Sequence, residues 1–419
     1  NAPLITFVNS DNGATAGSAS ALEGNSGSTT MTFRVVLSNP SHEDIVIAYS
    51  TADGTATVLN GDYNAASGTL TILAGQTEGT IDVQINGDNT YENNETFFLN
   101  GTVVSGTVSG STTFSGIGTI LNDDGVPIIS FANNDNGATG GSASANEGNS
   151  GVTPIIFRIA LSNPSNEDIT LSYFTSNGTA TLADNDYVSA SGTVTILAGQ
   201  TEVFITVNAI GDTKFETNET FTVTATVTSG NVSSSTTFVG TGTILNDDAI
   251  PTIAFVNNDN GATAGSASVA EGNSGSTTMT FRIALSNPSH EDITIAYSTA
   301  DGTATALNGD YTPTSGTLTI LAGETEATID VQINGDTTFE NNETFLLNGT
   351  VTSGTVSGST TFAGIGTILN DDGVPTITFI NNDNGATGGS ASVIEGNSGT
   401  ALMTFRIVLS NASAEDITF

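Results

Sequence analysis

Short segments with alternating apolar and polar residues run along the whole chain. In one such segment, Met31, Phe33, Val35 and Leu37 fall on one face. Ile81–Ile85 follows the same rule, with aspartate and glutamine at the positions between the apolar residues. Alternation with a period of two indicates a strand that buries one face. Glycine is frequent and no period of 3.6 residues is sustained, so we expect strands and no helix.

Turn residues rich in Gly, Asn, Asp and Pro separate these segments. The first 124 residues therefore predict about eight short strands, and this number favours an all-β, antiparallel β-sandwich. The expected strands are Leu4–Val8, Ser18–Leu22, Thr30–Ser38, Ile45–Thr51, Thr69–Leu73, Thr80–Asn86, Thr96–Val104 and Thr112–Leu121.

The same pattern returns at a fixed spacing. The segment EGNSG begins at Glu23, Glu147, Glu271 and Glu395, which gives a period of 124 residues. TILNDD recurs with the same spacing, and the chain stops in the middle of a fourth copy, as expected for a window from a longer array. We predict complete repeats at residues 1–125, 126–249 and 250–373, and a partial repeat at 374–419.

The connectors between repeats are short. Pro127, Pro251 and Pro375 each stand just before the first strand of the next repeat. Proline restricts the backbone and a Gly-rich linker is absent, so we expect semi-rigid coupling and an elongated rod.

The charge is strongly one-sided, with 43 Asp and Glu residues against 5 Lys and Arg residues. This balance argues against nucleic acid and anionic membranes as partners. No apolar run is long enough to span a bilayer, so direct membrane insertion of this segment is not expected. The carboxylates serve either solubility or the binding of cations.

Many carboxylates lie in turns, where loops from alternate strand ends meet at one end of a sandwich. Such convergence would suit Ca²⁺, which prefers 6–8 oxygen ligands, whereas Zn²⁺ favours Cys and His. The topology could also scatter these acids over both ends of the sandwich, and the spacing alone leaves both arrangements open. In the first repeat the acids are Glu23, Asp62, Asp88, Glu92, Glu95, Asp123 and Asp124.

Four motifs follow one another in each repeat. In the first they read DGTATVLNGDY, GTLTILAGQT, NGDNTYENNETF and TILNDD. In this order they resemble the Calx-β domain. The resemblance covers most of each repeat and implies a seven-stranded immunoglobulin-like sandwich with Ca²⁺ at one end. Carried over by motif, the implied ligands are the seven acids above together with Glu147, Asp186, Asp212, Glu216, Glu219, Asp247, Asp248, Glu271, Asp310, Asp336, Glu340, Glu343, Asp371 and Asp372.

The chain also departs from the family pattern. Asn122, Asn93 and Asn94 stand where the family often has acids, which implies one or two weaker ions per domain. The stretch Phe7–Ser20 is longer than in the family. It is either a flexible loop or a contact with a neighbouring domain or chain.

Other recurring polar residues suit structural roles. The arginines of the FR pairs are expected to point outward and to pair with a nearby acid. No Ser/His/Asp arrangement repeats, and GNSGS lacks a plausible base, so we do not expect an enzyme. The arginines are Arg34, Arg158, Arg282 and Arg406.

We therefore expect the structural repeat region of a long, calcium-stabilised bacterial surface adhesin or filament, secreted and extracellular. Its partners would be neighbouring repeats and identical chains, which could associate laterally or by strand donation. The alternative is a calcium-dependent module that binds carbohydrate or protein, or a calcium sensor. A sugar-binding module should show exposed aromatic residues, yet the chain has no Trp.

Overall fold

The computed structural model describes residues 1–8, 17–132, 141–256, 265–380 and 389–419. These residues form strands and no helix, so none of them forms a helix that could cross a membrane. The chain divides into two compact units. The first comprises Asn1–Asn146, Val152–Ile210 and Asn218–Leu245, and the second comprises Glu147–Gly151, Gly211–Thr217 and Asn246–Phe419.

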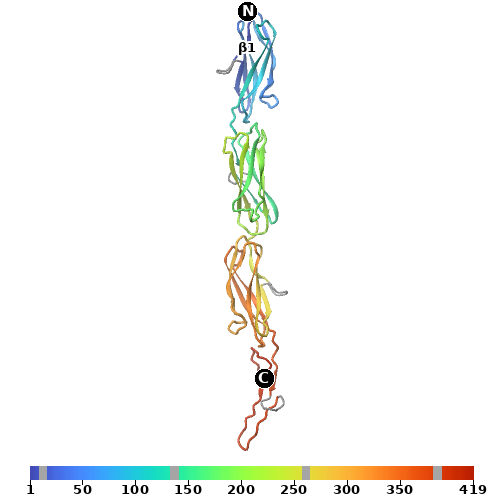
Figure 1. Ribbon diagram of the computed structural model, residues 1–419, viewed down its shortest axis with the longest axis vertical. Helices are drawn as coiled ribbons and strands as arrows, with labels where there is room; N and C mark the ends of the chain where they lie inside the picture. The colour runs from blue at the N-terminus through green and yellow to red at the C-terminus, as the bar shows by residue number, and fades with distance from the viewer. Residues whose placement is uncertain (9–16, 133–140, 257–264, 381–388) are drawn as a thin grey trace. The chain divides into compact units, whose positions relative to one another are not determined.

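The first repeat folds into two sheets packed face to face. One sheet has three strands in the order β1-β3-β6 and the other has five in the order β2-β8-β7-β4-β5. Figure 1 shows these strands at the blue end of the colour bar. They are β1 (Ile5–Val8), β2 (Ser18–Leu22), β3 (Gly27–Leu37), β4 (Ile45–Asp53), β5 (Ser67–Ile72), β6 (Glu78–Gly87), β7 (Glu95–Ser105) and β8 (Thr113–Leu121).

All eight strands expected from the sequence are present, with ends shifted by a few residues. Two details differ from expectation. The family resemblance implied seven strands, whereas the first repeat has eight, with β1 in one sheet and β2 in the other. The sandwich is also not wholly antiparallel, since β2 pairs with β8 in parallel. The chain changes sheets between β1 and β2 without reversing direction, and β2 therefore runs alongside the last strand.

The later repeats have the same topology. The sandwich of the second repeat has sheets β14-β11-β9 and β10-β16-β15-β12-β13, and that of the third has β17-β19-β22 and β18-β24-β23-β20-β21. Their strands are β9 (Ile129–Ala132), β10 (Ser142–Asn146), β11 (Gly151–Leu161), β12 (Ile169–Asn177), β13 (Ser191–Ile196), β14 (Glu202–Gly211), β15 (Glu219–Ser229), β16 (Thr237–Leu245), β17 (Ile253–Val256), β18 (Ser266–Ala270), β19 (Gly275–Leu285), β20 (Ile293–Ala300), β21 (Ser315–Ile320), β22 (Glu326–Gly335), β23 (Glu343–Ser353) and β24 (Thr361–Leu369).

The described residues after the third repeat form a two-stranded sheet, in which β25 (Ile377–Ile380) pairs with β26 (Arg406–Leu409). Phe379 and Phe405 remain about half exposed there. No second sheet covers these two rings in the part of the segment that the structure describes. The long stretch that the sequence marked between Phe7 and Ser20 falls mostly outside the described residues.

Each sandwich has its own hydrophobic core, built from the alternating positions of its strands. In the first repeat, Phe33 packs edge-on against Phe97, and Phe97 stacks on Tyr63 with ring centroids 4.4 Å apart. The hydroxyl of Tyr63 donates a hydrogen bond to Asp53 Oδ1 at 2.7 Å. This pairing satisfies the polar tip of a ring that is otherwise fully buried.

The outward face carries the expected ion pairs. Arg34 pairs with Glu78 at 2.6 Å and Arg158 pairs with Glu202 at 2.7 Å. Arg282 pairs with Glu326 in the same way. All these side chains are well exposed, so each pair contributes at most about 1 kcal/mol.

Candidate metal site

The topology brings the predicted acids of a repeat to one end of the sandwich. Strands β2, β4, β6 and β8 all run toward that end, because β2 and β8 are parallel and β7 is antiparallel to both β4 and β8. The end of β6 lies there too, since Asn86 donates its backbone N–H to the carbonyl of Asp62 at 3.0 Å. Convergence at one end, which the spacing left open, is therefore what the fold produces.

A close backbone approach fixes the loop that carries Glu23. A Cβ atom at Gly87 would lie 1.9 Å from the carbonyl oxygen of Gly24, so only glycine fits at the end of β6. A Cβ atom at the equivalent Gly335 would lie 2.0 Å from the carbonyl oxygen of Gly272. Glycine at this position therefore lets the EGNSG turn pack directly on the acidic loop that follows β6.

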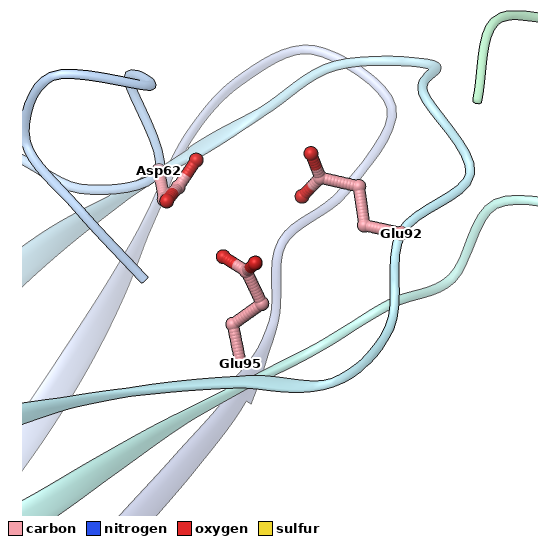
Figure 2. A group of neighbouring side chains, drawn as sticks. All are labelled: Asp62, Glu92 and Glu95. Atoms are coloured by element: carbon pink, nitrogen blue, oxygen red, sulfur yellow. The ribbon is translucent and has the colours of Figure 1, made fainter. Parts of the chain in front are cut away.

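Asp62, Glu92 and Glu95 form the first cluster of the first repeat. One carboxylate oxygen from each lies within 4.8 Å of the others. Figure 2 shows the three carboxylates directed toward a common space, Asp62 from the turn after β4 and the two glutamates from the segment that leads into β7. Asp62 is held in place by the backbone N–H of Thr57, which donates to its Oδ2 at 2.6 Å. In the third repeat, Asp310, Glu340 and Glu343 form the same cluster.

A second cluster joins the EGNSG turn to the residues that leave the last strand. Glu147, Asp247 and Asp248 lie within 4.8 Å of one another, as do Glu271, Asp371 and Asp372. In the first repeat, Asp123 and Asp124 act on Glu23 electrostatically. Asp123 Oδ1 accepts the backbone N–H of Gly24 at 3.0 Å, which fixes the acid opposite the turn.

Several oxygens of this second cluster are buried without a hydrogen-bond donor. In Asp124, Oδ1 accepts from Asn25 at 2.7 Å, whereas Oδ2 is buried and has no partner. Glu23 Oε1 is also buried and unpartnered. Asp248 Oδ2, Glu271 Oε1 and Asp372 Oδ2 repeat this state in the other copies. Because a buried charged oxygen without a partner is costly, these atoms fit the ligand set of a cation.

Several of the other predicted acids make hydrogen bonds within their own turns. Asp88 Oδ1 accepts the N–H of Thr90 at 2.6 Å and so closes the turn, and Asp212 and Asp336 do the same in their repeats. Asp186 accepts the N–H of Thr181 at 2.6 Å, and Glu219 is the first residue of β15. Glu216 receives a further contact, described below.

Burial and like-charge repulsion raise the pKa values of the glutamates. Burial, and then repulsion by Glu92, raises the pKa of Glu23 to about 7. Burial and repulsion by Asp62 raise the pKa of Glu95 to about 8. Glu147 behaves alike, with a pKa of about 8 from burial and from repulsion by Glu216. Without a cation these sites therefore hold protons near neutral pH.

The donor set is made of oxygens alone. The clusters contain carboxylates but no His, and the chain has no Cys. Such a set fits Ca²⁺, which accepts many oxygens in flexible geometry, and does not fit Zn²⁺. The buried, unpartnered oxygens and the raised pKa values of the glutamates are the observations that support this fit.

Asn122 has a role that the sequence did not reveal. The family resemblance implies that it replaces a ligand acid, but its Oδ1 accepts the backbone N–H of Glu92 at 3.1 Å. Its Nδ2 donates to the carbonyl of Asp124 at 2.9 Å. Asn246 and Asn370 make the same two bonds. The asparagine therefore ties the acidic loop to the exit of the last strand.

The acidic loop also contacts the next repeat. Tyr91 donates its N–H to Pro164 O at 2.9 Å and accepts the N–H of Asn166 at 3.0 Å. Asn93 Nδ2 donates to Glu167 Oε1 at 3.2 Å. In the second unit, Phe215 and Phe339 make backbone contacts equivalent to those of Tyr91. The sequence did offer a sign of this contact. An aromatic residue, Tyr91, Phe215 or Phe339, stands just before the loop glutamate in each complete repeat.

The comparisons with known proteins identify the family of the repeats. A model of the Calx-beta domain matches residues 17–106, 139–248 and 257–359, which together make up more than half of the chain. No curated protein shows significant similarity to the chain.

Among solved structures, "Crystal structure of CBD12 from CALX1.2" is 22% identical, with 53% of this chain and 79% of that chain covered and a TM-score of 0.24. "Crystal structure of calcium binding domain CBD12 of CALX1.1" is 21% identical, with coverages of 53% and 78% and a TM-score of 0.23. "Crystal structure of Apo-form Calx CBD1 domain" is 21% identical, covers 30% of this chain and 100% of its own, and has a TM-score of 0.24. Scores this low carry no structural argument, so the assignment rests on the family model.

Proposed function

Because the chain belongs to the Calx-beta family, we propose that its repeats bind Ca²⁺ at their acidic ends and that calcium stabilises them there. The observation that carries this proposal is the recurrence, at a spacing of 124 residues, of buried carboxylate oxygens that no donor satisfies. Burying a charged oxygen without a partner costs free energy, so its presence in successive repeats favours a cation that binds it.

The ligands would come from four parts of each repeat. In the first repeat three of these are Glu23 after β2, Asp62 after β4 and the loop that follows β6, which carries Glu92. The fourth is the exit from β8, where Asp123 and Asp124 accept hydrogen bonds from the EGNSG turn. Bound Ca²⁺ would supply positive charge that offsets the repulsion among these groups. The oxygens of Asp62 and Asp123 are already oriented by backbone N–H groups, which lowers the cost of ordering them.

Thermal unfolding of the full chain, with Ca²⁺ and then with chelator, tests this proposal. At a free Ca²⁺ concentration of about ten times Kd, each occupied site adds roughly 1.4 kcal/mol to the free energy of unfolding. Sites of the extracellular kind have a Kd of about 10⁻⁴–10⁻³ M, so the titration should extend to several millimolar. An unchanged Tm across that range would contradict calcium binding.

At the level of the whole protein, we propose a structural role as the repeat region of a long bacterial surface adhesin or filament. The hydrogen bonds that Tyr91 donates to Pro164 and accepts from Asn166 support it, because they link the first repeat to the second through the acidic loop. The exact period also supports it, since repeats of one length suit an array whose useful property is extension. Cell-surface labelling and electron microscopy of native material test this role. Intracellular labelling or compact particles would contradict it.

The calcium-dependent binding module is the second candidate, and the family assignment favours it directly. A module of this kind binds its ligand only when calcium is present. Glycan-array and protein-array binding by the full chain, with and without chelator, separates it from a purely structural role.

A further inference from the structure

The second repeat carries a positive charge where its neighbours carry none. Lys214 is the only lysine of the chain, and Thr90 and Thr338 occupy its position in the other complete repeats. Its ammonium group forms an ion pair with Glu216 Oε1. The two side chains are only 23% and 9% exposed. By contrast, the surface pair of Arg158 and Glu202 is 38% and 43% exposed.

Glu216 belongs to the acidic end of its repeat. Its backbone N–H donates to Asn246 Oδ1 at 3.0 Å, as that of Glu92 does to Asn122. Glu216 also lies near enough to Glu147 to repel it. Its equivalents Glu92 and Glu340 are both members of a carboxylate cluster. The ion pair with Lys214 therefore forms at the proposed calcium site and not on the open face of a sheet.

The turn places the ammonium group there. Asp212 Oδ1 accepts the backbone N–H of Lys214 at 2.6 Å, the same bond that Asp88 makes to Thr90. The backbone therefore follows the same course in both repeats, and the change at this position is a threonine side chain exchanged for a cationic one. The exchange leaves the loop in place and adds one positive charge among its acids.

We propose that Lys214 is a built-in counter-ion that makes the second repeat bind Ca²⁺ more weakly than the first and third, and depend on it less for stability. The proposal rests on the calcium binding proposed above. The ammonium group occupies an oxygen that a divalent ion would use, and it repels that ion. Calcium must displace Lys214 from Glu216 Oε1 before that oxygen can act as a ligand.

A calcium titration of the full 419-residue chain by isothermal calorimetry tests this, with wild type compared to Lys214→Thr and Thr338→Lys. Both variants install a residue that this position already carries in another repeat, so both should fold. We expect Lys214→Thr to lower the Kd for Ca²⁺ of the weakest class of sites about tenfold. Thr338→Lys should raise the Kd of one class by a similar factor. Thermal unfolding in chelator supplies a second readout, in which Lys214→Thr lowers the Tm and Thr338→Lys raises it.

Arg158→Thr is the matched control. It removes the same charge from the same repeat but breaks only the surface pair with Glu202, and it should leave the isotherm unchanged. If wild type binds calcium but Lys214→Thr leaves both the isotherm and the Tm in chelator unchanged, the proposal for Lys214 is wrong. The proposed calcium binding is then still supported. If wild type binds no calcium at all, both proposals fall.

Discussion

The backbone N–H of Glu92 donates a hydrogen bond to Oδ1 of Asn122 at 3.1 Å. This bond joins the acidic loop after β6 to the residues that leave β8, two segments that enclose the proposed calcium site. It explains why an amide is suitable where the family often has a carboxylate. The Nδ2 atom of the same side chain donates to Asp124 O, which a carboxylate could not do.

Asn122→Ala should lower the free energy of unfolding of the first repeat by about 2 kcal/mol, because two hydrogen bonds are lost at a partly buried position. Chemical denaturation of the full chain measures this loss. Asn122→Asp is the informative companion, since it keeps the acceptor for Glu92 but loses the donor to Asp124. We expect it to be intermediate in chelator, and a stability equal to wild type would assign no role to the Nδ2 bond.

Glu95→Gln should have opposite effects with and without calcium. In chelator it should raise the Tm, because it removes one of three mutually repelling carboxylates. In saturating calcium it should lose much of the roughly 1.4 kcal/mol that one site adds at about ten times Kd. Glu78→Gln is the control, since Glu78 pairs with Arg34 on the exposed sheet face. A Tm for Glu95→Gln below wild type in chelator would contradict the repulsion argument.

The calcium-free chain should become less stable as the pH rises from about 4.5 to about 8. The pKa of Glu23 rises from 4.5 to about 7 on folding and that of Glu95 from 4.5 to about 8. Over this window the folded state binds more protons than the unfolded state, so the free energy of unfolding falls with increasing pH. Unfolding in chelator at pH 5 and pH 8 measures the slope. Saturating calcium should flatten or reverse it, and equal slopes with and without calcium would contradict the site.

Phe97→Ala should cost about 3–5 kcal/mol of stability, because the ring is fully buried between Phe33 and Tyr63. The adjacent Phe98 faces outward and is 39% exposed. Phe98→Ala therefore serves as a control that removes the same side chain from the same strand. Denaturant midpoints should separate the two variants clearly, and comparable losses would show that the two sides of β7 are equally packed.

The sequence predicted the strands well, because a strand that buries one face alternates apolar and polar residues along a short stretch of chain. Met31, Phe33 and Val35 alternate with polar or less buried residues, and all three proved to be buried. The position of the acids in turns was equally local and therefore visible. The parallel pairing of β2 with β8 was not, because it joins segments about a hundred residues apart and leaves no pattern in either of them.

Two features of the site also escaped the sequence for physical reasons. Asn122 looked like a weakened ligand, because composition cannot tell whether an amide oxygen faces an ion or a backbone N–H. Lys214 was visible as an isolated lysine, but its effect depends on a contact with Glu216 that only the folded loop creates. The resemblance to the Calx-β domain located the acids, and the grouping of those acids required the fold.

The hydrogen bonds of Tyr91 to Pro164 and Asn166 set an order of events during synthesis. The chain is made from the N-terminus, so every strand of the first repeat exists before its acidic loop has this anchor. The loop acquires both bonds only after residue 166 has left the ribosome. The acidic loop of the first repeat is therefore completed by residues of the second repeat, and it gains these two bonds later than the rest of its own sandwich.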